Sequence, residues 1–82
     1  MNENLIYEWF KKRGIEMEVI VENKDANYLE LGFVDSLGFL ELITLCEEKF
    51  GISFTDDDFT DDAIFSIAGL INIVNRKIDD GQ

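Results

Sequence analysis

The most constraining feature of the chain is the stretch SLGFLELITLCEEKF at residues 36–50. Its apolar residues recur at offsets of 0, +3, +4, +7 and +11, which is the spacing of one face of an α-helix. They are Phe39, Leu42, Ile43, Cys46 and Phe50. Gly51 follows directly, and glycine commonly ends helices. The sequence therefore predicts an amphipathic helix of about 15 residues that begins beside Asp35 and Ser36.

Two other segments have helical periodicity. The first lies before Gly14, and its apolar residues are Leu5, Ile6, Trp9 and Phe10. The second begins at Ser66, and its apolar residues are Ile67, Leu70, Ile71, Val74 and Ile78. We assign Trp9 and Phe10 to the core, and we expect a short helical turn around residues 57–61. The predicted fold is all-α: a small bundle of three main helices plus a short extra helix.

The segment IEMEVIVE at residues 15–22 resists such an assignment. Met17, Val19 and Val21 alternate with glutamates, which is the period of a strand, but a single strand would have no partner. We therefore expect an extended segment or an irregular helix end that packs its apolar side chains on the bundle. Residues 23–34 have the composition of a loop, so a long loop precedes the second main helix.

Charge limits the kinds of partner. The 82 residues include 18 acidic and 7 basic ones, for a formal net charge of -11, while 46% of the residues are hydrophobic, which indicates a folded chain. An anionic surface repels phosphate backbones and attracts basic surfaces. We expect one domain over residues 1–82, a monomer, and no nucleic-acid partner.

Cysteine and histidine counts exclude further classes. One cysteine and no histidine leave no intramolecular disulfide and no zinc cluster. Cys46 lies on the apolar face, so we expect a buried, unreactive thiol. No apolar run approaches about 18 residues, and the first residues lack the pattern of a signal peptide. We expect a cytoplasmic protein without stable membrane insertion.

The acidic run TDDDFTDD at residues 55–62 invites a test for calcium binding. If an EF-hand loop began at Asp56, Asp61 would stand where glycine is needed and Ile67 where the bidentate glutamate is needed. The run is therefore no EF-hand. A solvated loop is favoured over weak binding of divalent ions, and we predict no metal site.

Ser36 has two interpretations at the start of its helix. Its side chain can cap the helix by accepting a hydrogen bond from a first-turn amide. Alternatively, Asp35 caps the helix and the Ser36 hydroxyl projects outward, where the helix dipole favours a phosphodiester. Nucleophilic catalysis fails because there is no histidine base and no lysine in the flanking motif. We predict no catalytic residue; any chemistry at Ser36 is activated by another enzyme.

The outer face of this helix is a candidate surface for partners. Its residues are Leu37, Leu40, Glu41, Thr44, Glu47 and Glu48. The face is either an ordinary solvated surface or a docking strip, in which apolar anchors have an anionic rim. Charge reversal of the glutamates distinguishes the two.

The stretch LGFVDSLGFLELITLCEEKFGISF at residues 31–54 resembles the centre of an acyl carrier protein. The likeness rests on the triplet Asp35, Ser36 and Leu37, on the pairs Glu41-Leu42 and Glu47-Glu48, on Phe50, and on FSIAGLINIV as the last helix. The resemblance implies an acyl-carrier-like helical bundle with a long loop before the attachment serine.

The resemblance also implies roles for individual residues. In that family a phosphopantetheinyl transferase moves 4'-phosphopantetheine from coenzyme A to the serine, which corresponds to Ser36 here. Asp35 corresponds to the acid that helps the transferase and its metal ion engage. Leu37, Leu40, Glu41 and Glu48 fall where family members meet basic enzymes that activate or transfer acyl or aminoacyl groups.

Two departures from many fatty-acid carriers bear on the cargo. Gly38 replaces an acidic residue, and Thr44 replaces a larger apolar anchor. Gly38, with ENKD upstream and GFVDSLG around it, is similar instead to D-alanyl carrier proteins. Asp35 argues against peptidyl carriers, which usually have a histidine before the serine.

The leading hypothesis is a stand-alone acyl carrier protein that presents an acyl thioester to enzymes of fatty-acid, lipid or secondary-metabolite synthesis. One alternative is a D-alanyl-like aminoacyl carrier, and another is an acidic helical interaction module without a prosthetic group. If the bundle shelters an acyl chain, we expect its mouth near Leu37, Leu40, Ile64 and Phe65.

Overall fold

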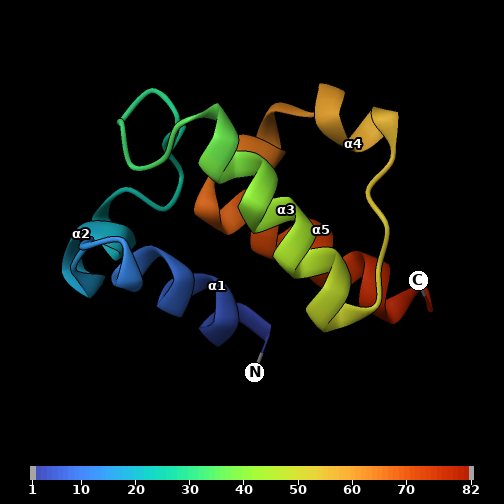
Figure 1. Ribbon diagram of the computed structural model, residues 1–82. Coiled ribbons are helices and arrows are strands. Elements are labelled where there is room, and N and C mark those ends of the chain that lie inside the picture. Colours follow the sequence, from blue (N-terminus) through green and yellow to red (C-terminus); the bar gives the residue numbers. More distant parts are fainter. Residues whose placement is uncertain (1, 82) are drawn as a thin grey trace.

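The structure is a computed structural model that describes residues 2–81 (Figure 1). Its elements are α1 (Asn2–Lys12), α2 (Met17–Glu22), α3 (Ser36–Phe50), α4 (Asp56–Thr60), the 3₁₀ helix η1 (Asp62–Phe65) and α5 (Ile67–Asp79). The described residues contain three long helices and no strand, which confirms the predicted all-α bundle. The short elements are more numerous than predicted, because α2 and η1 accompany the expected turn at α4.

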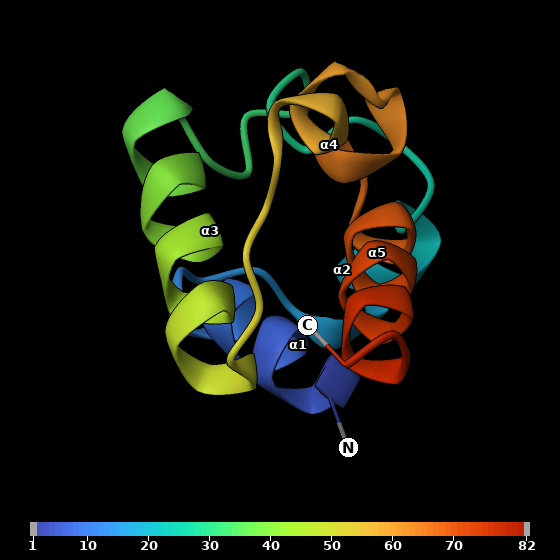
Figure 2. The same ribbon diagram turned by 90° about the vertical axis from the view of Figure 1, so that its right-hand side faces the viewer.

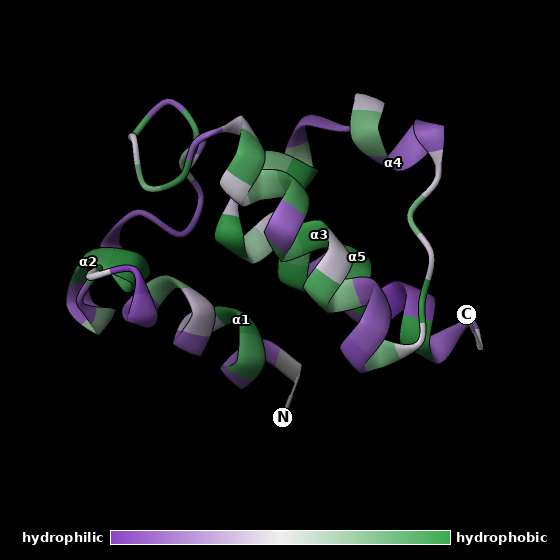
Figure 3. Cartoon of the chain, in the orientation of Figure 1, coloured by the Kyte–Doolittle hydropathy of each residue, from purple (hydrophilic) through white to green (hydrophobic). Residues whose placement is uncertain are grey.

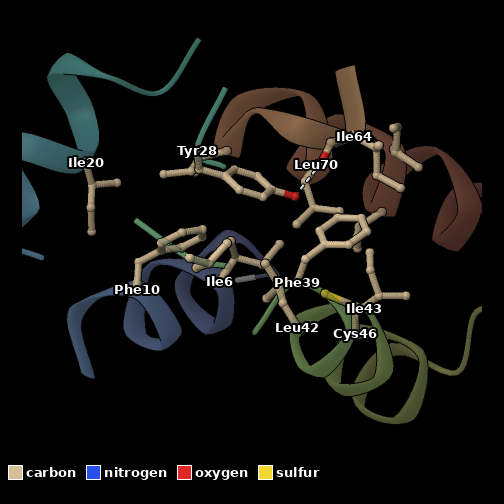
Figure 4. Close-up of a cluster of buried hydrophobic side chains, with 14 of the residues drawn as sticks. Ile6, Phe10, Ile20, Tyr28, Phe39, Leu42, Ile43, Cys46, Ile64 and Leu70 are labelled. Carbon is tan, nitrogen blue, oxygen red and sulfur yellow. Dashed lines mark hydrogen bonds between the residues drawn. The ribbon is translucent and has the colours of Figure 1, made fainter. Parts of the chain in front are cut away.

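The three long helices enclose the core. Figure 2 shows α3 and α5 on opposite sides of the bundle, with α1 below them and α4 above. α1 packs against both α3 and α5. The core side chains come from all three helices and from the connecting segments; they include Ile6, Phe10, Tyr28, Leu42 and Leu70 (Figure 4). Burial of this apolar surface is the main term that stabilises the fold.

α3 forms as its periodicity predicts. Phe39, Leu42, Ile43 and Cys46 are buried, and Phe50 is half-buried at the last turn. Gly51 ends the helix with φ of 65°, in the left-handed region that glycine adopts without strain, and its N–H bonds to the last turn.

For residues 15–22 we expected an extended segment or an irregular helix end, and the structure has a separate short helix there instead, α2. Met17–Glu22 is a short helix that packs against α1 and buries Ile20 alone, while Met17, Val19 and Val21 are exposed. The alternation of apolar and acidic residues is thus not a strand signal here. α2 is six residues long and buries Ile20 alone, and a single buried residue produces no 3.6-residue pattern.

The loop between α2 and α3 is tied to the start of α5. Tyr28 N–H donates to the Phe65 carbonyl at 2.9 Å, and the buried Tyr28 hydroxyl donates to the Ile64 carbonyl. Asn27 pairs with Ser66 in an isolated antiparallel bridge. These bonds hold the middle of the loop, at Asn27 and Tyr28, against η1 and the residue that caps α5.

α5 begins one residue later than predicted, because Ser66 is its N-cap rather than its first helical residue. Its buried residues are Ile67, Leu70, Ile73 and Val74, whereas the predicted Ile71 and Ile78 are half-buried. η1 lies directly against its first turn: a side chain on Gly69 would clash with the Ala63 carbonyl oxygen.

The acidic run contains α4, which confirms the short helical turn expected around residues 57–61. Thr55 and Asp58 cap it reciprocally, and Asp58 also pairs with Lys77 of α5 at 2.7 Å. Figure 3 shows the start of α4 in the colour of hydrophilic residues, whereas α3 alternates hydrophobic and hydrophilic stretches. Among residues 2–81, no helix is both long and apolar enough to cross a membrane.

Candidate functional site

The start of α3 separates the capping group from the neighbouring hydroxyl. Asp35 is the N-cap, and its Oδ1 accepts a hydrogen bond from Gly38 N–H at 2.8 Å. Ser36 is the first helical residue; it is exposed, and its hydroxyl has no hydrogen-bond partner within residues 2–81. The interpretation in which Asp35 caps the helix is therefore the one that the geometry confirms.

This arrangement fits a phosphodiester-linked arm on Ser36. The hydroxyl is accessible to another enzyme, and the first-turn amides of α3 carry the partial positive charge that stabilises an anion. Gly38 is buried in the first turn of α3. A Cβ at this position would lie 3.6 Å from the Arg13 guanidinium carbon. Ser36 is thus exposed at the end of α3 where the helix dipole favours an anion.

The outward face of α3 runs away from Ser36. Leu37, Glu41, Thr44 and Glu48 are at offsets of 0, +4, +7 and +11, which places them on one side of the helix. Leu37 is 69% exposed and Leu40 is 57% exposed. Two large apolar side chains this open to solvent beside a candidate modification site are the kind of surface that partners cover.

This face forms one wall of a groove between α1 and α3. The groove has a volume of about 530 Å³ and is lined by Trp9, Arg13, Leu40, Glu41, Thr44, Leu45 and Glu48. The sequence pointed to Leu40, Glu41, Thr44 and Glu48 but not to the α1 side. Trp9, which was predicted to be core, is only half-buried and divides its surface between the core and the groove.

Arg13 connects the two walls of the groove. Its Nη2 donates to Glu41 Oε1 at 2.7 Å, and its guanidinium carbon lies 4.0 Å from the centre of the Trp9 ring. The side chains are 38% exposed for Arg13 and 58% exposed for Glu41. The pair joins residues 28 positions apart, so no local pattern in the sequence could have revealed it.

Glu47 lies outside the groove. It is half-buried, and its Oε2 accepts a hydrogen bond from Phe54 N–H at 3.0 Å, which holds the segment after α3 against the helix. Glu48, one residue later, is exposed and lines the groove. The structure thus separates two glutamates that the sequence placed on the same candidate surface.

Aromatic rings fill the interior behind the predicted mouth. Ile64 is fully buried, and its carbonyl accepts the bond from Tyr28 (Figure 4). The Phe65 ring lies 5.3 Å from that of Phe39, which in turn lies 6.2 Å from Tyr28. Burial, with a smaller contribution from Cys46, raises the pKa of Tyr28, so its hydroxyl remains a donor. Of the four predicted mouth residues, Leu37 and Leu40 are exposed, and Ile64 and Phe65 belong to this packing.

The surroundings of two further titratable groups, Cys46 and Asp58, shift their pKa values. Burial, and secondarily the Glu47 charge, raises the pKa of Cys46 to about 12, as expected for an unreactive thiol. Burial alone would raise the pKa of Asp58, but bonds from Lys77 and Thr55 and the Lys77 charge together lower it. In the described part of the chain, no group of three or more acidic or cysteine side chains could hold a metal ion.

Comparison with known proteins assigns this arrangement to a family. Residues 13–74 match the family described as PP-binding: Phosphopantetheine attachment site. A D-alanyl carrier protein from Abiotrophia defectiva is 32% identical over 63 residues, which span 77% of this chain and 80% of that protein. No solved structure gives a significant match.

The matched segment includes all of α3 and most of α5, and it confirms the resemblance that the sequence motifs indicated. Proteins of this family hold their cargo on 4'-phosphopantetheine, while transferases and acyl- or aminoacyl-handling enzymes perform the chemistry. The chain therefore belongs to the phosphopantetheine-attachment family and is a non-catalytic carrier protein.

Proposed function

We propose that Ser36 is the attachment site for phosphopantetheine and that the chain carries an aminoacyl thioester on this arm. The observation that supports the site most directly is the start of α3, where Asp35 caps the helix and leaves the Ser36 hydroxyl exposed. Asp35 then has a second role beside the cap, because its carboxylate is available to the transferase and its metal ion. The whole of residues 1–82 acts as one carrier domain.

The carrier contributes geometry rather than chemistry. A thioester on a flexible arm raises the effective concentration of the cargo at a partner's active site, and this needs no acid or base from the carrier. Leu37, Leu40, Glu41, Thr44 and Glu48 form the docking face for the partner enzymes, whose basic surfaces the net charge of -11 attracts. Glu47 supports the Phe54 segment and contributes to docking only through its charge.

Two observations favour an aminoacyl cargo over a fatty-acyl one. The similar protein from Abiotrophia defectiva is a D-alanyl carrier. In addition, the rings of Tyr28, Phe39 and Phe65 occupy the interior next to the first turn of α3. A long apolar chain would have to displace these rings at the cost of core packing, whereas a small amino acid with a charged ammonium group gains nothing from burial.

The proposal is tested by loading the phosphopantetheinylated protein with two kinds of ligase. One activates amino acids, D-alanine among them, and the other activates fatty acids; the product is read by intact mass. We expect a mass gain with an amino-acid-activating ligase and none with Ser36→Ala. Loading by the fatty-acid ligase alone would replace the aminoacyl assignment by the acyl one. Full biological activity of Ser36→Ala would instead favour an interaction module without a prosthetic group.

A further inference from the structure

The groove between α1 and α3 contains a binding site for a guanidinium group that the chain fills itself. An aromatic face and a carboxylate are two groups that bind arginine well in proteins. Trp9 and Glu41 provide both, and Arg13 occupies both at once, at 4.0 Å from the Trp9 ring centre and 2.7 Å from Glu41 Oε1. The occupied site lies on the face that the proposed function assigns to partners.

The surroundings of this site favour a second cation. Glu48 lies further along the same groove and forms no ion pair within residues 2–81, and Leu40 presents an exposed apolar side chain to the same groove. The chain as a whole carries 18 acidic and 7 basic residues. A partner segment with an arginine next to an apolar side chain therefore complements the groove in both charge and shape.

We propose that Arg13 holds the place of a partner's arginine. On docking, an arginine of the partner enzyme binds Trp9 and Glu41, an adjacent apolar side chain packs beside Leu40, and Arg13 turns toward solvent. This inference rests on the proposed function, because it concerns the same docking face. It adds α1 to that face and names the partner group that α1 receives.

Arg13 and the partner's arginine bind the same two groups, so Arg13 competes with the partner enzyme for this site. Both side chains of the internal pair are substantially exposed, so the pair is weak, and its removal should strengthen docking by about two- to fivefold. A partner whose basic group is poorly placed cannot displace Arg13, and the contact thus contributes to partner selection.

The first test measures kcat/KM for modification by a promiscuous phosphopantetheinyl transferase with coenzyme A at low salt. Arg13→Gln is compared with Lys11→Gln, which removes the same charge two residues away, in the last turn of α1, but breaks a pair with Glu8 outside the groove. We expect Arg13→Gln to exceed Lys11→Gln by about two- to fivefold, and we expect this gain to disappear in a Glu41→Gln background.

The second test uses the single tryptophan of the chain as a reporter. Ser36→Ala protein containing 5-fluorotryptophan has one ¹⁹F signal, from Trp9, and cannot be modified while the transferase docks. We expect the signal to shift or broaden saturably as transferase is added, because the Trp9 ring exchanges the Arg13 guanidinium for that of the partner.

The outcomes separate this inference from the proposed function. If the native chain is modified but Arg13→Gln and Lys11→Gln react at equal rates, or if the Trp9 signal stays unmoved at saturating transferase, Arg13 is no placeholder and the carrier function stands. If the native chain gains no phosphopantetheine, the proposed function is overturned, and the inference with it.

Discussion

α3 and α5 both start beside a serine that is followed within one turn by a glycine, yet the two serines have opposite environments. Ser66 is the N-cap of α5: its Oγ accepts from Gly69 N–H at 3.0 Å and donates to the Ala63 carbonyl at 3.3 Å. Ser36 lies one residue inside α3, because Asp35 is the cap there. A shift of one position relative to the cap thus decides whether a hydroxyl supports the helix or stands free for modification.

The two glycines extend the same contrast. Gly69 is packed so closely against the Ala63 carbonyl that a side chain has no room, whereas a Cβ on Gly38 would meet Asp35 Oδ1 at 3.2 Å and Val34 Cβ at 3.5 Å. The start of α5 is closed by backbone. The start of α3 is bounded mainly by side chains, which can adjust their positions, and Ser36 is exposed there.

The largest expected effect is a reciprocal outcome for the two serines. Ser36→Ala should abolish phosphopantetheine attachment and change the free energy of unfolding by less than about 0.5 kcal/mol, as for an exposed side chain without partners. Ser66→Ala should still accept phosphopantetheine, but its free energy of unfolding should fall by about 1 kcal/mol, because the substitution removes the N-cap of α5. Urea unfolding and intact mass measure both quantities. Equal stability losses would contradict the contrast.

A second pair of substitutions compares the glycines. Gly69→Ala should destabilise the protein by about 1–3 kcal/mol, because the Ala63 backbone must move. Gly38→Ala should change stability by less than about 1 kcal/mol, since its better helix propensity offsets a tight contact with Asp35. The midpoints of urea unfolding give the difference. A Gly38→Ala variant as unstable as Gly69→Ala would show that the α3 start is equally closed.

Substitutions of Asp35 can separate two effects of this residue: the hydrogen bond that caps α3 and the charge of the carboxylate. Asp35→Ala should lose about 1 kcal/mol and react slowly with the transferase, whereas Asp35→Asn, which also caps well, should keep the stability and still react slowly. Stability comes from thermal or urea unfolding, and the rate from the mass gain over time. If Asp35→Asn reacts at the native rate, the carboxylate acts only as a cap.

The smallest expected effects concern two ion pairs, Asp58 with Lys77 and Arg13 with Glu41, and the response of the first pair to low pH. Asp58 and Lys77 are 17% and 13% exposed, in contrast with the open pair of Arg13 and Glu41. The folded pKa of Asp58 is below its ordinary value of 3.8, so the stabilisation is present above that pH and is lost as pH falls through the folded pKa. The native chain should exceed Asp58→Asn in unfolding free energy at pH 5–7 by about 1 kcal/mol, and the gap should close below about pH 3.8. A gap that persists in acid would mean that the stabilisation does not come from the charge of Asp58. At neutral pH, Arg13→Gln should lower the free energy of unfolding by less than about 0.5 kcal/mol.

Local patterns in the sequence predicted the parts of the fold that repeat along one face. α3 and α5 bury residues at helical spacing, and the Asp35, Ser36 and Leu37 triplet indicates the candidate site from sequence alone. α2 escaped prediction because one buried residue makes no period. The α1 wall of the groove escaped because the contact between Arg13 and Glu41 spans 28 positions. Contacts of that separation depend on how helices pack, which composition and spacing do not encode.

The contrast between the two serines also offers the most direct test of the central claim. Trypsin cuts after Lys24, Lys49 and Arg76, so Ser36 and Ser66 fall in different peptides, 25–49 and 50–76. The native protein is incubated with coenzyme A and a promiscuous phosphopantetheinyl transferase, and both peptides are weighed. We predict a gain of one phosphopantetheine on peptide 25–49 and none on peptide 50–76. A gain on peptide 50–76, or none on either peptide of a folded and initially unmodified chain, would contradict the assignment of Ser36.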